Sequence, residues 1–376
     1  MNIGIDATAL YGTYGGVEYS LWNLLCALNA VDDSHHYTVY IPCDGPPPDH
    51  LHDFSARWRW VRLPFSGTHK ARRILWQQTQ FPRQVMRDGC DLLHAPTYVS
   101  PLTAPLPVVL TVYDLIALSH PEFATRLNRL HYGALLPRCI ASATRVVVPT
   151  DLVRHEVARR VPAALERTRV IPLGVEPLFH ETHDAAARHE GRTRYQLPER
   201  YLLFVGNFEP KKNLHNLLRA LTMVPDAPPL VIIGGARAWS GHDIRDIQAA
   251  AGAGRSPHPV ISLGYVRRRD LPVLYALCEA FVFPSLAEGF GLPVLEALAS
   301  GAAVVTSDVV PLPGLADVAA ICDPHQPASI AHQIERVLSD SGWRDDLRRK
   351  AHAYAQPFTW RRTAEMTLNV YRETQN

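Results

Sequence analysis

Residues 280–308 read Ala-Phe-Val-Phe-Pro-Ser-Leu-Ala-Glu-Gly-Phe-Gly-Leu-Pro-Val-Leu-Glu-Ala-Leu-Ala-Ser-Gly-Ala-Ala-Val-Val-Thr-Ser-Asp. The apolar runs 280–283 and 302–306 are typical of strands that are buried on both faces of a parallel sheet. Between them, Pro293 suits the first turn of a helix, where its missing N–H is not needed, and Gly301 suits the end of that helix. The stretch therefore predicts the order strand, loop, helix, strand.

The loop in this stretch has the composition of a ligand site. Gly289 and Gly291 allow the backbone to approach a ligand closely, and the start of the helix offers free N–H groups. Glu288 and Glu296 can accept hydrogen bonds from hydroxyl groups. A tight turn followed by one exposed helical glutamate is the structural alternative. Two glutamates eight positions apart favour a phosphate or a polyhydroxy ligand such as a sugar.

Length and composition limit the class of protein. A chain of 376 residues with 47% hydrophobic residues predicts two domains, each with its own core. The net charge of +2 gives no reason to expect a nucleic acid partner. The six cysteines form no C-x-x-C pair and no cluster with histidine at metal spacing, so we expect reduced thiols and no metal site.

The N-terminus and the apolar runs bear on location. Met-Asn-Ile-Gly-Ile-Asp at residues 1–6 is typical of a strand rather than of a signal peptide. No apolar run approaches the roughly 20 residues that a membrane-spanning helix needs. We therefore expect a soluble cytoplasmic protein, and attachment to a membrane surface remains open.

Further apolar runs along the chain resemble buried strands, and periodic runs near its end resemble helices. The predicted strands are 3–6, 37–41, 91–95, 108–114, 145–149, 201–205, 230–234 and 260–263. The predicted helices near the end are 330–338, 343–355 and 362–374. The polar segment 177–198 fits a linker between two domains.

Several polar positions near these elements are candidates for ligand contacts. Gly15 and Gly16 lie between the first strand and a helical pattern, although many α/β domains begin with such a turn. Lys212 and Asn213 lie at the start of a predicted helix, where N–H groups and an ammonium would together attract an anion. The alternative is that Asn213 caps the helix and that Lys211 and Lys212 are solvated. Asp114 ends the predicted strand 108–114, so it is a candidate for a ligand contact or for an Asx-turn cap.

Two basic segments stand out. Residues 69–87 mix five Lys and Arg side chains with Trp76, Phe81 and other apolar residues, and Pro82 interrupts any long helix. This segment predicts either contact with an anionic membrane or a packed helix with a solvated basic face. The short run Arg267–Arg269 is expected to be solvated.

The segment Glu288-Gly-Phe-Gly-Leu-Pro-Val-Leu-Glu296 resembles the Glu-x7-Glu motif of retaining glycosyltransferases with the GT-B fold, and it most resembles family 4. Other matches follow in family order along nearly the whole chain. They are Gly15-Gly16, Asp114, Ile171 to Glu176, Lys212-Asn213 and Phe358 to Trp360.

This resemblance implies an α/β protein of two Rossmann-like parallel-sheet domains that face each other across a cleft, with a C-terminal helix that crosses back to the first domain. The implied domains are 1–185 together with 358–376 on the acceptor side, and 186–357 on the nucleotide-sugar side.

The resemblance also implies roles for individual residues. Lys212 would bind the donor phosphates, Glu288 the sugar hydroxyls and Glu296 the ribose. Asn207 stands where the family often has Arg, and Tyr113 stands where it often has His, so both depart from the pattern. The other implied donor contacts are Gly15, Gly16, Tyr265, Val266, Gly289, Phe290, Gly291 and Leu292, while Asp114 would serve the acceptor.

The implied activity is retaining transfer of a hexose from a nucleotide diphosphate sugar to a hydroxyl of a glycan or a lipid-linked glycan. Residues 206–213 resemble those of bacterial mannosyltransferases and rhamnosyltransferases of polysaccharide assembly, which favours GDP-mannose over a UDP- or dTDP-sugar. No metal and no further cofactor are implied. A catalytically silent GT-B binding module is the alternative. A nicotinamide-dependent oxidoreductase is disfavoured because no stretch matches G-x-G-x-x-G after a strand.

Overall fold

The computed structural model describes residues 1–12, 15–235, 246–247, 249 and 259–375. The chain forms two compact units, each built on its own parallel sheet. The first unit is Met1–Gly174 with Phe358–Asn376, and the second is Val175–Pro357. Each unit is described by itself.

The sheet of the first unit has the strand order β3-β2-β1-β4-β5-β6-β7, and every neighbouring pair is parallel. Its central strands are buried on both faces, as their continuous apolar sequences predict. The strands are β1 (Asn2–Asp6), β2 (His36–Ile41), β3 (Trp58–Arg62), β4 (Leu92–Ala95), β5 (Val108–Thr111), β6 (Arg145–Val148) and β7 (Thr168–Val170).

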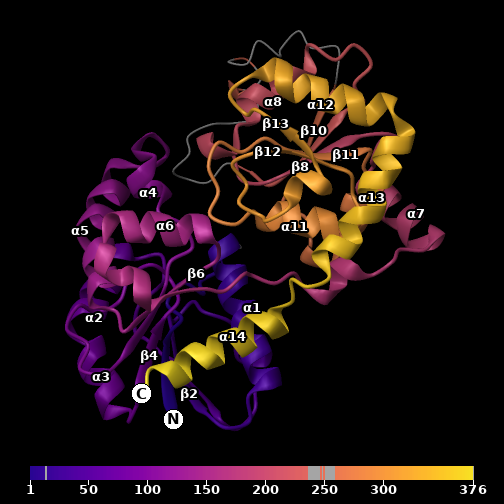
Figure 1. The fold of residues 1–376 in the computed structure, drawn as a ribbon. Coiled ribbons are helices and arrows are strands. Elements are labelled where there is room, and N and C mark those ends of the chain that lie inside the picture. Colours follow the sequence, from indigo (N-terminus) through magenta and orange to yellow (C-terminus); the bar gives the residue numbers. More distant parts are fainter. Residues whose placement is uncertain (13–14, 236–245, 248, 250–258, 376) are drawn as a thin grey trace. The chain divides into compact units, whose positions relative to one another are not determined.

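Helices flank this sheet, and α1 and α14 pack against each other although they come from opposite ends of the chain (Figure 1). The segment 69–87 forms two helices, because Pro82 lies in the first turn of the second and has no N–H to continue the first. The helices are α1 (Gly16–Val31), α2 (Lys70–Thr79), α3 (Phe81–Arg87), α4 (Ile116–Ser119), α5 (Arg126–Ser142), α6 (Asp151–Arg160) and α14 (Trp360–Glu373).

The second unit repeats this architecture with the strand order β10-β9-β8-β11-β12-β13, again parallel throughout. The stretch that decides the fold forms its centre, since β11 pairs with both β8 and β12. The strands are β8 (Leu202–Val205), β9 (Leu230–Ile233), β10 (Val260–Gly264), β11 (Ala280–Phe283), β12 (Val304–Ser307) and β13 (Ala320–Cys322).

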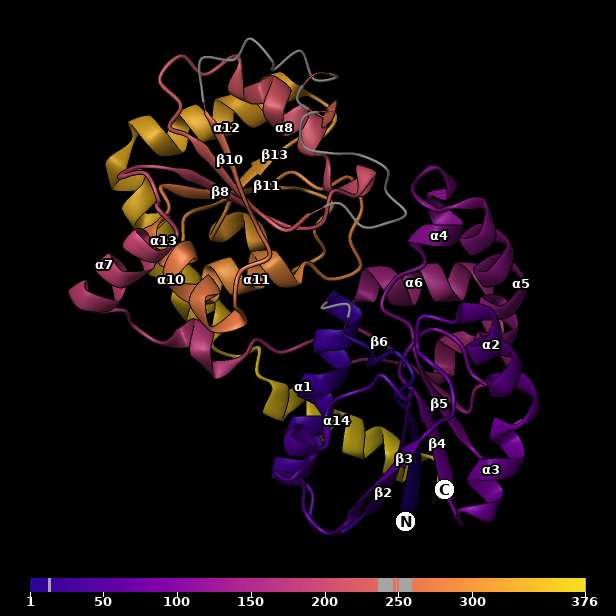
Figure 2. The same ribbon diagram turned by 180° about the vertical axis from the view of Figure 1, so that it is seen from behind.

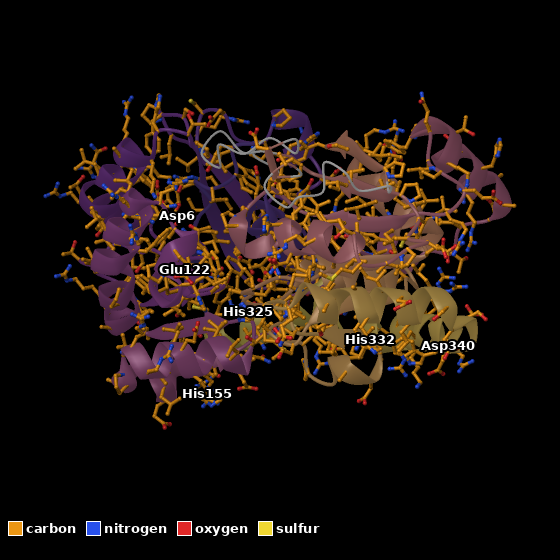
Figure 3. All side chains as sticks on the ribbon, turned by 90° about the horizontal axis from the view of Figure 1, so that it is seen from above. Asp6, Glu122, His155, His325, His332 and Asp340 are labelled. Carbon is orange, nitrogen blue, oxygen red and sulfur yellow. The ribbon has the colours of Figure 1, made fainter. Side chains whose placement is uncertain are left out.

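In the second unit, α8 and α12 pack together, and α11 packs with α13 (Figure 2). Asp340, labelled in Figure 3, caps α13 by accepting a hydrogen bond from the backbone N–H of Trp343. The helices are α7 (Ala185–Arg194), α8 (Leu214–Leu221), α10 (Leu271–Leu277), α11 (Leu292–Ala299), α12 (Pro327–Ser339) and α13 (Ser341–Ala355).

The C-terminal helix belongs to the first unit through specific contacts. Nδ1 of the buried His94 lies 2.7 Å from the hydroxyl of Tyr371, and Nε2 of the same ring lies 2.9 Å from Oγ1 of Thr111. A Cβ on Gly174 would lie only 2.1 Å from the backbone N of Trp360, so only glycine allows the start of α14 to approach this closely.

The structure differs from the sequence predictions in three respects. Strands β3, β7 and β13 lie in segments where no strand was predicted. β5 ends at Thr111, so Asp114 lies in the following loop rather than in a strand. The two units meet between Gly174 and Val175 instead of at residue 185, because the buried Phe179 packs against Tyr275 of α10 and ties this segment to the second unit.

No helix in the described part of the chain combines the length and the apolar character that crossing a bilayer requires.

Candidate functional site

The second unit places two loops side by side at the carboxyl ends of β8 and β11, the edge at which open α/β sheets bind ligands. The hydroxyl of Ser285 and the backbone N–H of Leu286 both donate to the carbonyl of Lys211, at 3.0 and 2.7 Å. Asn213 adopts a left-handed conformation, with φ of 60°, and its side-chain amide donates to the carbonyl of Pro284 at 2.9 Å. These bonds fix the loop after β8 against the loop after β11.

Lys212 and Glu288 meet where these loops touch. The ammonium Nζ of Lys212 lies 2.7 Å from Oε1 of Glu288, and the two side chains are only 13% and 8% exposed. The same ammonium lies 4.7 Å from the centre of the Phe283 ring. The sequence singled out Lys212 and Glu288 for separate roles, and the structure brings them into one buried ion pair.

Glu288 is held as a carboxylate. Burial works to raise its pKa, but the charges of Lys212 and Lys211 and hydrogen bonds from Lys212 and Ser285 outweigh burial, so the pKa lies below its ordinary value. The single hydroxyl hydrogen of Ser285 is shared between Oε1 of Glu288, at 2.6 Å, and the carbonyl of Lys211. The site therefore holds a negative charge balanced by one ammonium.

The turn after Glu288 leads directly into α11. Gly291 precedes the helix with φ of 100°, and a Cβ there would lie 2.6 Å from Cγ1 of Val310, so glycine is required for both conformation and space. Phe290 is buried, and Leu292 begins the helix with Pro293 in its first turn, as predicted. The first N–H groups of a helix have no partner within the helix, and this helix begins four residues after Glu288.

Glu296, one turn into α11, lies among other side chains rather than facing solvent. Arg268 donates to Oε1 at 2.6 Å, and the hydroxyl of Tyr275 donates to Oε2 at 3.3 Å. Burial raises the pKa of Glu296, and Glu176 adds to this rise, while the charge of Arg268 and the two hydrogen bonds oppose it. The net direction is upward from the ordinary value.

Arg268 corrects a sequence prediction. The run Arg267–Arg269 was expected to be solvated, and Arg269, at 72% exposure, is. The Arg268 side chain is only 22% exposed; it contacts Glu176 as well as Glu296, and its guanidinium lies 4.5 Å from the ring centre of Phe179. A run of three arginines does not indicate which of them is buried. The ion pair between Arg268 and Glu296 becomes visible only in the structure, where Arg268 begins the short helix η7 (Arg268–Asp270) and Glu296 lies in α11.

Asn207 and Tyr265 lie at the ends of β8 and β10. The hydroxyl of Tyr265 donates to Oδ1 of Asn207 at 2.7 Å, and Tyr265 is 60% exposed. Val266 follows, partly buried. An exposed aromatic ring next to a polar side chain offers a planar ligand a face on which to stack.

Gly15, Gly16 and Asp114 belong to the first unit. Gly15 is the N-cap residue of α1, and a Cβ on Gly16 would meet no atom of the described residues within 4 Å. The backbone N–H of Gly12 donates to Glu18 in the first turn of α1 at 2.6 Å. Open N–H groups at the start of a long helix attract anions.

Asp114 adopts the Asx-turn arrangement that was one of its two predicted roles. Oδ1 accepts from the backbone N–H of Ile116 at 3.0 Å, and Oδ2 accepts from the hydroxyl of Tyr98 at 2.9 Å. Tyr98 has φ of 70°, an uncommon conformation for a residue other than glycine. No sequence pattern singled out Tyr98, whose role depends on the conformation of the loop after β4.

Family models match both units of the chain. Residues 14–177 match the model described as Glycosyltransferase Family 4, and residues 188–356 match the model described as Glycosyl transferases group 1. These two stretches contain every candidate site residue, in the order that the sequence resemblance implies.

Similar proteins agree with this assignment. The chain is 29% identical over 293 residues to an O-antigen chain mannosyltransferase B of Escherichia coli, covering 76% of each chain. It is 32% identical over 250 residues to a D-inositol 3-phosphate glycosyltransferase of Salinispora tropica, covering 62% of this chain and 52% of that protein.

Solved structures share the whole fold. The Anabaena protein HepE, solved in complex with UDP and glucose, superposes with a TM-score of 0.77 at 19% identity and covers 99% of this chain and 100% of that one. The two parallel-sheet units and this likeness identify the GT-B fold. Because the two family models match in order and together span residues 14–177 and 188–356, the chain belongs to the family 4 glycosyltransferases.

Proposed function

We propose that this glycosyltransferase transfers mannose from GDP-mannose, with retention of the anomeric configuration, to a hydroxyl of a glycan or lipid-linked glycan in bacterial polysaccharide synthesis. The observation that carries the proposal is the buried pair of Lys212 and Glu288 at the start of α11. The similarity to an O-antigen chain mannosyltransferase supports mannose as the sugar.

The main requirement of the reaction is to stabilise the negative charge that forms on the leaving diphosphate. Breaking the bond between the anomeric carbon and the diphosphate oxygen leaves negative charge on the diphosphate, which fixed cations and N–H groups stabilise best. Lys212 and the backbone N–H groups of Gly289 to Gly291 supply these. When the diphosphate takes over Lys212, Glu288 becomes available to accept hydrogen bonds from the sugar hydroxyls.

Retention requires no covalent intermediate in this proposal. The acceptor hydroxyl attacks the face from which the diphosphate departs, the new glycosidic bond forms as the old one breaks, and the diphosphate takes the hydroxyl proton. Asp114, held by Tyr98 and Ile116, accepts a hydrogen bond from the acceptor. No metal and no further cofactor take part, since the cations come from the chain.

The remaining donor contacts follow from the positions of the side chains. Glu296 accepts hydrogen bonds from the ribose hydroxyls, and Tyr265 with Val266 contacts the base. Asn207 offers an amide where a second cation is common, so Lys212 and the turn of Gly289 to Leu292 bear more of the phosphate charge. Gly15 and Gly16 offer N–H groups to the diphosphate.

We place the reaction in the cytoplasm, with peripheral contact to the inner membrane through α2 and α3. Leu75 and Met86 on these helices are 63% and 51% exposed, and Arg72, Arg83 and Arg87 lie exposed on the same helices. Apolar tips surrounded by basic side chains suit an anionic bilayer surface.

The direct test is incubation of the protein with GDP-mannose, UDP-glucose and dTDP-rhamnose, followed by detection of released nucleoside diphosphate. Slow release of GDP from GDP-mannose is expected even without an acceptor. Release of UDP or dTDP instead would change the donor and keep the activity. Binding of nucleotides without release from any donor would identify a silent binding module and overturn the proposal.

A further inference from the structure

Lys70 and Arg73, one turn apart on α2, are partly buried cations without a carboxylate partner in the described part of the chain. The ammonium of Lys70 donates to Oδ1 of Asn128 at 2.5 Å and lies 5.3 Å from the ring centre of Tyr132. Lys212 and Arg268, which are also partly buried, are paired with glutamates, whereas the hydrogen bonds of Lys70 and Arg73 go to neutral oxygens. Two neighbouring cations with only neutral hydrogen-bond partners can each form a stronger, charge-assisted hydrogen bond to an anion.

Arg73 faces the loop after β1 rather than an acid. Its guanidinium carbon lies 5.8 Å from the ring centre of Tyr11, and Nη1 lies 3.4 Å from the carbonyl of Thr8. Asp6, at the end of β1 and labelled in Figure 3, has its oxygens engaged, since it accepts from the Thr8 hydroxyl at 2.7 Å and from the side-chain amide of Gln77 at 2.6 Å.

The pKa values of Lys70 and His131 are lowered by burial and also by nearby positive charge. Burial lowers the pKa of Lys70, and the charge of Arg73 lowers it further. Burial, followed by the charges of Lys70 and Arg73, lowers the pKa of His131 on α5 to about 4. The charged forms of Lys70 and His131 are therefore disfavoured here, and a bound anion would offset this repulsion.

The same cluster reaches Asp114. The Tyr132 ring, beneath Lys70, lies 5.7 Å from the ring of Tyr98, whose hydroxyl donates to Asp114. Tyr11, Tyr98 and Asp114 follow β1, β4 and β5, whose carboxyl ends form the ligand edge of the first sheet. The two cations, the tyrosine rings and the carboxylate are thus linked by a series of side-chain contacts within the first unit.

We propose that Lys70 and Arg73 bind an anionic group of the acceptor, a phosphate or a sugar carboxylate, next to the hydroxyl that Asp114 contacts. The inference rests on the glycosyl transfer proposed above and adds the chemical class of the acceptor. The planar guanidinium of Arg73 suits two parallel hydrogen bonds to either group, and Lys70 adds a point charge.

His131 is the reporter for the test. NMR with ¹³C-labelled histidine follows its titration, and the variant His131→Gln assigns the resonance. Pyrophosphate tests the phosphate source, and D-glucuronate tests the carboxylate source. Binding of either is expected to shift the His131 resonance and to raise its pKa toward the ordinary value, because the anion offsets the charges of Lys70 and Arg73.

Matched variants complete the design. Lys70→Gln and Arg73→Gln are each expected to lower the affinity for whichever anion binds the wild type by about tenfold. This is the scale for losing one hydrogen bond to a charged group. Arg72→Gln removes an exposed charge from the same helix and is expected to change affinity little. The Lys212→Ala background removes anion binding at the donor site and is expected to leave the His131 response intact.

The outcomes separate this inference from the proposed function. A His131 resonance and pKa that neither anion moves would overturn the inference, and so would equal losses in Arg72→Gln and Arg73→Gln. Donor hydrolysis measured on the same protein tests the other claim. Hydrolysis of a donor without a His131 response would contradict the anion site alone. A His131 response without hydrolysis of any donor would contradict the proposed activity alone.

Discussion

The guanidinium of Arg268 donates a 2.6 Å hydrogen bond to Oε1 of Glu296 and also contacts Glu176, so one buried cation joins the helix of the donor site to the first residues of the second unit. Burial opposes the charge of Arg268, but the two glutamates raise its pKa, so the group stays protonated. The carboxylate proposed to bind the ribose is thereby oriented before any nucleotide arrives.

Removing this cation should weaken nucleotide binding. In Arg268→Gln, Glu296 would be buried beside Glu176 without a counter-charge, so it would protonate or move. The affinity for GDP, measured by calorimetry, is expected to fall about tenfold or more. Arg268→Lys should recover part of the loss, and Arg269→Gln, at an exposed position, should bind as the wild type does. Unchanged affinity in Arg268→Gln would remove this residue from the donor site.

The buried His94 predicts acid sensitivity of the first unit. Burial lowers its pKa to about 3, against an ordinary value of 6.5, so the unfolded chain binds a proton that the folded chain excludes. Its effect on stability is absent above the unfolded pKa and grows as the pH falls from there toward 3. Between pH 7 and pH 5 the wild type should lose about 2 kcal/mol of unfolding free energy through this group.

Urea denaturation of the wild type and of His94→Gln at the two pH values checks this. The variant is expected to be less stable at pH 7, because the bonds to Tyr371 and Thr111 are changed, and to lose less stability on acidification. An equal loss in both proteins would assign the acid sensitivity to other groups.

Membrane contact makes a separate prediction. Sedimentation with phosphatidylglycerol vesicles should exceed sedimentation with phosphatidylcholine vesicles and should decrease with salt, because exposed charges are screened. The double variant Leu75→Ser with Met86→Ser should bind less, whereas Met223→Ser, exposed on the second unit, should not. Equal binding to both kinds of vesicle by all three proteins would contradict contact through α2 and α3.

The sequence predicted the elements whose pattern is local. The strand, glycine turn and helix of residues 280–299 follow from apolar runs and from the positions of Gly291 and Pro293, and the structure confirms them. Lys212 and Glu288 were identified by their places in the family motif. Their direct pairing was not, because 76 residues separate them and only the loop contacts of Lys211 and Asn213 bring them together.

Residues whose role depends on packing could not be read from the sequence. The buried Arg268 has two arginine neighbours that conceal it, and Tyr98 lies in an ordinary loop sequence. The short edge strand β13 has only three residues, too few for a periodic pattern. The cations of α2 were visible in the sequence as a basic segment. Only the structure shows that Lys70 and Arg73 have no acidic partner among the described residues.

The most direct test of the central claim is the turnover of GDP-mannose by Lys212→Ala, measured as GDP released under saturating donor. If Lys212 stabilises the leaving diphosphate, turnover should fall by about 10²-fold or more, the scale for losing one such donor group. Lys350→Ala, which removes an exposed lysine of α13, should retain wild-type turnover, and circular dichroism should show both variants folded. A folded Lys212→Ala protein that turns over GDP-mannose at the wild-type rate would contradict the account.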